Sequence, residues 1–202
     1  MANFLAIAAV TATIRERLMQ VATRQSADTD NDLADTQVTT LPPDKAGSQE
    51  DRNQINLYLY QVGPNAVLRN VPEVRAQVGP PPLALDLYYM ISAYGRNNDE
   101  ILTQRLLGRA MTLLHAAPYL TSAEVNAALP ASELQMQTDL VKLVPMSLGT
   151  EELFRLWSTF QAKYRLSTVY RASAVVIEAA PLVALPQVSQ RKVSVGPTGP
   201  TR

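Results

Sequence analysis

Alternation of apolar and polar residues predicts three long β-strands in this 202-residue chain. The clearest run is 83–94, in which successive side chains fall on opposite faces of an extended chain. Both of its faces are largely apolar, so we expect this strand to be central in a sheet that is covered on both sides. Similar alternation over 55–62 and 166–179 predicts two further strands, and 36–41 and 139–144 predict two short ones.

Apolar residues spaced three and four positions apart predict three amphipathic helices. The first covers residues 4–23. The second begins at Asn98, a favourable N-cap residue, and ends before Pro118. The third covers 150–160 and begins with Thr150 as its cap, followed by two glutamates that favour the positive end of the helix dipole.

Local expectations attach to three positions. Gly108 interrupts the second helix at a cost of about 1 kcal/mol relative to alanine, so we expect close packing against the sheet to require it. Pro145 lacks a backbone N–H, so we expect the strand 139–144 to stop there. Trp157, the only tryptophan, we expect to anchor the core rather than stack on a ligand. Among the apolar residues, those predicted to be buried are Leu85, Leu87, Ile91, Leu106, Leu113, Trp157 and Val175.

The order of these elements predicts an α+β fold with a mixed or antiparallel sheet packed against helices. We expect one domain over residues 1–179, with an acidic insertion at about 26–53. The insertion contains seven acidic residues against two basic ones. Residues 180–202 contain four prolines, three basic residues and no acidic one, which predicts a flexible basic tail outside the fold.

The tail carries apolar residues in addition to its charge. Exposed ion pairs contribute only about 0–1 kcal/mol each, so we expect the apolar residues to anchor the tail, by docking on a partner or by adding a strand to its sheet. A terminus without any partner is the alternative. The interface residues predicted on this basis are Leu182, Val183, Leu185, Val188, Arg191 and Lys192.

Composition excludes several classes of function. The formal net charge is zero, which gives no basic surface for nucleic acid. The chain has no cysteine and one histidine, which excludes disulfides, thiolate metal sites and histidine-rich metal sites. No apolar run reaches the roughly 20 residues that span a bilayer, and Arg15 to Arg17 interrupt the alanine-rich start too early for a signal peptide. We therefore expect synthesis in the cytoplasm and no membrane insertion.

Candidate chemistry is sparse. Asp86 lies within the most apolar strand, and a buried carboxylate needs a partner, so a structural ion pair or hydrogen bond is favoured over a catalytic acid. His115 falls in the last turn of the second helix, where a capping or packing role is expected. We find no phosphate-binding loop, nucleophile–base pair or metal-ligand spacing. We expect no catalytic residue, no cofactor, no metal and no enzyme activity.

Five short motifs occur in a fixed order along the chain. A strand Pro-Pro-Leu-x-Leu-x-Leu-x-Tyr ends at Tyr89 and is followed by Leu-Leu-Gly at 106–108 and by Leu-Leu-His-x-x-Pro at 113–118. Leu-Trp-Ser at 156–158 and Tyr-Arg-Leu-Ser-x-x-Tyr at 164–170 complete the set. This order resembles the tail-terminator or cap proteins of phage-tail-like contractile injection systems, of the antifeeding-prophage and Photorhabdus-virulence-cassette type, over about residues 4–178.

The resemblance implies a tail-terminator-like fold and a structural role. Related cap proteins form a six-fold ring that seats on the last ring of the inner tube, stops its polymerisation and meets the end of the sheath. The implied partners are further copies of this chain in a hexamer, an inner tube protein and a sheath protein, within an assembled particle. The alternative is a non-enzymatic ligand- or protein-binding domain that uses four tyrosines expected to be exposed: Tyr58, Tyr60, Tyr88 and Tyr94.

Overall fold

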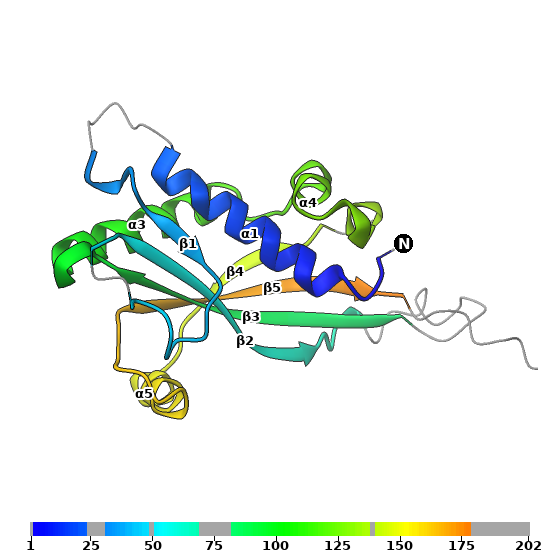
Figure 1. The fold of residues 1–202 in the computed structure, drawn as a ribbon. Coiled ribbons are helices and arrows are strands. Elements are labelled where there is room, and N and C mark those ends of the chain that lie inside the picture. The colour runs from blue at the N-terminus through cyan, green and yellow to red at the C-terminus, as the bar shows by residue number, and fades with distance from the viewer. Residues whose placement is uncertain (1, 24–30, 49–50, 69–81, 138–139, 179–202) are drawn as a thin grey trace, which may run out of the picture.

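The computed structural model of the chain describes residues 2–23, 31–48, 51–68, 82–137 and 140–178. It is an α+β fold in which a mixed five-stranded sheet lies between two unequal helical layers (Figure 1). Three helices cover one face and a single helix lies on the other. The helices are α1 (Ala6–Thr23), α3 (Glu100–Ala116) and α4 (Ser122–Ala128) on the first face, and α5 (Thr150–Thr159) on the second.

The strand order is β1-β2-β3-β5-β4, which places the run 83–94 at the centre of the sheet as predicted. The first pair is parallel and the other three pairs are antiparallel. Fold class and sheet type therefore agree with the sequence-based prediction. The strands are β1 (Gln37–Thr39), β2 (Gln54–Pro64), β3 (Leu83–Tyr94), β4 (Lys142–Met146) and β5 (Ser167–Ile177).

One continuous core fills the space between the sheet and its three-helix face. It contains Ile14 and Leu18 from α1, Leu106 and Leu114 from α3, and odd-numbered β3 residues such as Leu87. All seven residues predicted to be buried are buried, including Trp157, which lies on the opposite face under α5. Burial of each such side chain contributes roughly 1.5–3 kcal/mol, so this core is the main source of stability.

The helix caps differ from the predicted ones by one residue. Asp99 rather than Asn98 caps α3, because its carboxylate accepts a hydrogen bond from Leu102 N at 3.0 Å. Asn98 instead adopts a positive φ of 57°, a conformation that asparagine tolerates better than most residues. Gly149 rather than Thr150 is the N-cap of α5, since Thr150 is already its first helical residue.

Two further expectations are wrong, and one helix was not predicted. Gly108 is exposed, and a side chain there would meet no atom within 4 Å, so packing does not require this glycine. Pro145 lies inside β4, opposite Tyr170, and an edge strand tolerates the missing N–H. The unpredicted helix is α4, whose capping box joins Thr121 and Glu124.

A buried arginine ties the helical layer together. Arg17 of α1 donates two hydrogen bonds to the Glu124 carboxylate of α4, at 3.1 and 2.6 Å. It also donates to the backbone oxygens of Ala117 and Tyr119, in the segment between α3 and α4. Its side chain is only 4% exposed. Two hydrogen bonds to a carboxylate and two to backbone oxygens satisfy the buried guanidinium. They fix the positions of α1, α4 and the segment before α4 relative to one another.

Candidate assembly surface

Strand β2 is longer than the strand that covers its outer edge. β1 pairs only with Gln54 to Asn56, the first three residues of β2. The Asn56 side chain then holds the departing chain, because it accepts from Leu41 N and donates to Leu41 O, both at 2.9 Å. Beyond Asn56, the outer edge of β2 has no strand partner among the described residues, and this second half is called the open edge below.

The register shows which backbone groups face outward along this open edge. Asn53 O accepts from Gln37 N, so odd-numbered residues in the first half of β2, Leu59 included, point toward the β1 side. Tyr60 is an extra residue in a β-bulge, after which Gln61 pairs with Tyr88 and the alternation reverses. The N–H and C=O of Leu59 and Val62 therefore point away from β3, into the space beside β2.

The opposite edge of the sheet is closed. Leu143 N of β4 donates to Pro118 O at 2.7 Å, and Leu120 N donates to Val141 O at 2.9 Å, so the chain before α4 covers the first part of β4. The next residue of β4 that faces outward is Pro145, which has no N–H to donate. Both features are known ways of preventing another strand from pairing at an edge. The two edges of this sheet thus differ in their capacity to accept a partner.

An aromatic cluster lies on the outer face of the sheet, beside α5. The Phe154 and Tyr164 rings are 5.1 Å apart, and both are about half exposed, at 51% and 45%. Behind them the buried Trp157 meets Tyr164 edge-on at 6.2 Å and donates from Nε1 to Ser167 Oγ at 3.4 Å. Aromatic residues of this kind are frequent at the centres of protein interfaces. Trp157 is a core anchor, as predicted.

Asp86 has structural partners, as the sequence analysis favoured. Its carboxylate accepts a hydrogen bond from Asn65 Nδ2 at 2.8 Å and lies 3.9 Å from Arg171 Nη1 of β5. Asn65 in turn accepts from Leu68 N, which links Asp86 to the turn after β2. The carboxylate therefore stabilises the end of the sheet at which β2 ends and β3 begins.

The four tyrosines expected to form a ligand-binding surface do not form one. Tyr94 is buried, and burial is the largest cause of the rise in its phenol pKa. Tyr60 and Tyr88 are half-buried and pair with each other at 6.3 Å, and Tyr58 packs edge-on at 5.3 Å against Phe160, the C-cap residue of α5. These rings hold the outer layer in place, so the expectation of four exposed tyrosines is wrong.

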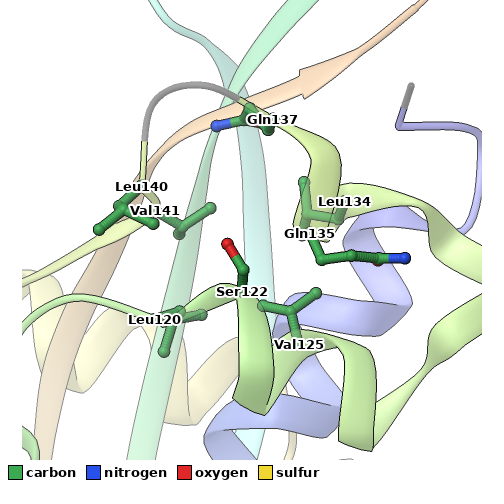
Figure 2. A pocket seen from close by; sticks show the side chains of 8 residues that line it. All are labelled: Leu120, Ser122, Val125, Leu134, Gln135, Gln137, Leu140 and Val141. Carbon is green, nitrogen blue, oxygen red and sulfur yellow. The ribbon is translucent and has the colours of Figure 1, made fainter.

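A small depression lies between α4, the 3₁₀ turn η5 (Leu134–Met136) and the chain that enters β4 (Figure 2). Its cavity volume is about 10 Å³, roughly the room that one water molecule needs and far below the roughly 300–1,000 Å³ of small-molecule sites. Apolar side chains such as Leu120 and Val125 form most of its wall. Gln135 contributes a buried side-chain oxygen without a hydrogen-bond partner. The depression is too small to argue for a ligand-binding function.

The described residues offer no chemistry beyond structure. They contain no group of three or more histidine, cysteine, aspartate or glutamate side chains that is arranged to hold a metal ion. His115 lies in the last turn of α3, as predicted, and its side chain is exposed there. Within the same part of the chain, no helix combines the length and apolarity needed to cross a membrane.

The interface residues predicted in the tail, Leu182, Val183, Leu185, Val188, Arg191 and Lys192, lie outside the described residues. The open edge at Leu59 and Val62 was not predicted. One signal was present in the sequence, since the run 36–41 is shorter than the run 55–62 that it accompanies. That signal became informative only when the structure showed that these two strands are neighbours.

Comparison with solved structures supports the tail-terminator fold. The chain is similar to the sheath/tube terminator of the extracellular contractile injection system PVC in its extended state, with a TM-score of 0.58 and 15% identity. It is also similar to the tube-terminating cap of the anti-feeding prophage AFP, with a TM-score of 0.53 and 11% identity. The alignments cover 94% and 92% of this chain, but only 65% and 60% of those two proteins.

Sequence comparison gives the family. No curated protein matches the sequence. The model of the family described as the Pvc16 N-terminal domain matches residues 9–191, which is most of the chain. The two similar structures are described as a sheath/tube terminator and a tube-terminating cap, and neither description names an enzyme. The chain therefore belongs to the Pvc16 N-terminal domain family.

Proposed function

We propose that this protein is a structural cap subunit of a contractile injection particle. Copies of it form a ring on the end of the inner tube, stop polymerisation of the tube and join the tube to the end of the sheath. The observation that carries the proposal is the family match over residues 9–191, together with the likeness to a sheath/tube terminator. A six-fold ring is the arrangement that the sequence resemblance implies.

The two edges of the sheet fit this role. A subunit that ends a polymer needs a surface that accepts a neighbour and another surface that offers no further site of addition. The open half of β2 is suited to the first requirement, and the covered edge of β4 is suited to the second. Repetition of one heterologous contact around an axis closes a ring, which limits growth within its plane.

The tail supplies a second part of the proposal. Residues 1–179 form the ring-building domain, and the tail after Ala180 contacts a neighbouring subunit or the sheath through Leu182, Val183, Leu185, Val188, Arg191 and Lys192. The acidic segment 26–53 carries the opposite charge, which favours head-to-tail contacts between subunits. The protein is made in the cytoplasm and then becomes part of the particle.

Deletion of the gene from a complete particle-producing cluster tests the cap function. Without a terminator, tubes should grow to uncontrolled lengths, which electron microscopy of purified particles measures. Complementation with the full-length gene should restore a narrow length distribution. If particles without the protein are intact and have unchanged lengths, the protein is not a cap. A saturable small ligand bound by a stable monomer would then favour the alternative of a ligand-binding domain.

Truncation after Ala180 tests the tail separately. The truncated protein should melt close to the temperature of the full-length protein, because the sheet, its helices and the buried core of the described residues all precede Ala180. Its incorporation into particles, measured by quantitative immunoblotting, should fall. Incorporation at the full-length level would show that the tail is a passive extension, while leaving the cap function of the domain intact.

A further inference from the structure

We infer that the open edge of β2 is the acceptor for the tail of a second copy of this chain, and that residues 182–185 add to it as a short sixth strand. This inference rests on the proposed ring and identifies the surface on which the tail acts. It follows from three observations, which concern the open edge, the tail segment and the length of chain between them.

The acceptor is a short stretch with unpaired backbone groups. Leu59 and Val62 direct their N–H and C=O outward, and among the described residues no strand faces them. Pro64 lacks an N–H, so the edge offers little beyond this point. Unpaired groups at a strand edge are a template for an extended peptide, because main-chain hydrogen bonds to the edge provide the affinity of strand addition.

The side chains at this edge are suited to an apolar strand. Val62 is 45% exposed, while Leu59 is half-buried and packs against the core between the sheet and α1. An added strand would bury the remaining apolar surface of both residues. No Lys, Arg, Asp or Glu lies between Leu57 and Pro64 to oppose a neighbour, although charges are the common protection of natural edges.

The tail segment matches this acceptor in length and composition. Residues 182–185 read Leu-Val-Ala-Leu and lie between Pro181 and Pro186. The two prolines limit a hydrogen-bonded strand to the four residues between them. The open stretch from Leu59 to Val62 also contains four residues, and the bulge at Tyr60 increases the local twist, which disfavours a longer partner.

The length of the chain determines which copy donates the strand. Glu178 is held in place, because its N–H donates to Ala2 O at 3.0 Å. The added strand would lie three strand spacings from β5, about 14 Å to the side. Val62 pairs with Leu87, and Leu83 pairs with Ile177. Glu178 and the position beside Val62 are therefore also about five residues, or about 16 Å, apart along the strand direction.

The separation is therefore about 21 Å, whereas the four steps from Glu178 to Leu182 span at most about 14 Å. A strand of the opposite direction would need Leu182 still farther along β2, beside Leu59. The chain cannot lay residues 182–185 along its own open edge in either direction. A second copy has no such restriction, and a contact in which each tail reaches the next subunit is heterologous, as ring closure requires.

Disulfide trapping tests the contact directly, since the chain contains no cysteine of its own. One protein carries Val62→Cys, and a second full-length protein carries Leu182→Cys or Leu185→Cys, for antiparallel or parallel pairing. The two are mixed under mild oxidation, both free in solution and in assembled particles. A disulfide needs Cα atoms within about 7 Å, so only direct neighbours react.

The expected result is a covalent dimer for one of the two pairs. Its yield should be several times that of a control in which Gln104→Cys, at an exposed site on α3, takes the place of Val62→Cys. A doubly substituted chain should give oligomers and not an internally linked monomer. An internally linked monomer would show that the tail of the same chain pairs with the edge of β2, which would overturn the assignment to a second copy. Yields no higher than the control, in solution and in particles, would overturn the inference.

A proline substitution tests the same contact by function. Val62→Pro removes an N–H that is not used within the sheet, and Val62→Thr keeps both that N–H and a β-branched shape. Val62→Pro should weaken incorporation into particles up to about tenfold, as expected for the loss of one hydrogen bond, while Val62→Thr should assemble like the parent. Equal melting temperatures of the two variants would exclude misfolding as the cause.

The outcomes separate this inference from the function on which it rests. If truncation after Ala180 reduces assembly and Val62→Pro does not, the tail binds another surface and the β2 edge is not its acceptor. If tube length does not depend on this protein at all, the cap function fails, even where trapping shows that the tail and the edge meet.

Discussion

The two faces of the central sheet are held by different kinds of contact. On the three-helix face, apolar side chains from α1, α3 and α4 form one continuous core with the sheet, and Arg17 joins the helices from within. On the other face, α5 is attached by one buried tryptophan and by a few edge-on ring contacts. This difference indicates that the core of the three-helix face determines the fold. The α5 face is a thin layer in which Phe154 and Tyr164 remain half exposed.

Trp157→Ala should have the largest effect and tests whether the thin layer is part of the cooperative unit. Loss of a buried tryptophan costs about 3–5 kcal/mol, within the range for Leu87→Ala of the main core, about 2–5 kcal/mol. Phe154→Ala on the same helix is the control, because that ring is half exposed. Chemical denaturation followed by circular dichroism measures all three. If Trp157→Ala unfolds at the denaturant concentration of the parent, α5 contributes nothing to the global fold.

Arg17→Met should destabilise the helical face by about 2–3 kcal/mol, because it leaves two backbone carbonyls and one carboxylate without their donor. Arg155→Met is the matched control, since Arg155 forms an exposed pair with Glu151 at 2.6 Å within α5. Such surface pairs contribute only about 0.3–0.5 kcal/mol. Thermal melting of both variants gives the difference, and equal losses would contradict a special role of the buried arginine.

The contact between Arg17 and Glu124 should also make stability depend on pH. Burial alone would raise the pKa of Glu124, but hydrogen bonds from Arg17 and from the Thr121 backbone outweigh it and lower the pKa below the usual value of 4.5. A carboxyl group whose pKa is lower in the folded protein stabilises the fold at pH values above its pKa in the unfolded chain. This stabilisation is lost as the pH falls through its pKa in the folded protein.

Glu124→Gln should therefore lower the melting temperature near pH 7, and the difference from the parent should shrink below pH about 4.5. Glu151→Gln, in the exposed pair, is the control and should show little change at either pH. A constant difference between Glu124→Gln and the parent from neutral to acidic pH would mean that the ionised carboxylate is not what stabilises the helical face.

Ala174→Gly should have the smallest effect and the opposite sign. Ala174 has a positive φ of 67°, at the bulge where Ser173 and Ala174 together oppose Asp86. Glycine adopts this conformation without strain, which should offset its greater freedom in the unfolded chain and give a gain of about 0.5 kcal/mol. Ala172→Gly, at a regular strand position, should instead destabilise the protein. Destabilisation by both variants would show that the bulge is not strained.

The sequence predicted the elements whose pattern is long and regular. β2, β3 and β5 are eleven or twelve residues long, and each contains a stretch of apolar–polar alternation that a helical period does not explain. It did not predict α4, because a seven-residue helix with one buried side chain has almost no apolar face to recognise. Pro145 was misjudged because the tolerance of a strand for proline depends on whether it lies at an edge, and only the tertiary structure determines this.

The candidate surface could be predicted only in part, for a similar reason. The composition of the tail marked it as a candidate, since apolar residues without acidic ones stand out in the sequence. The acceptor at Leu59 and Val62 arises from a mismatch between two neighbouring strands and from the Asn56 side chain that turns the chain away. No local pattern encodes which strands become neighbours, so this surface required the structure.

The position of β3 at the centre of the sheet has a consequence for the order of events during translation. Its partner β2 precedes it, but its other partner begins at Ser167, 73 positions after Tyr94. At about 5–20 residues per second, the ribosome leaves one edge of this apolar strand open for about 4–15 s. Nascent chains that crowd together on one messenger are therefore at risk of pairing through β3, and a pause in synthesis before Ser167 would lengthen that exposure.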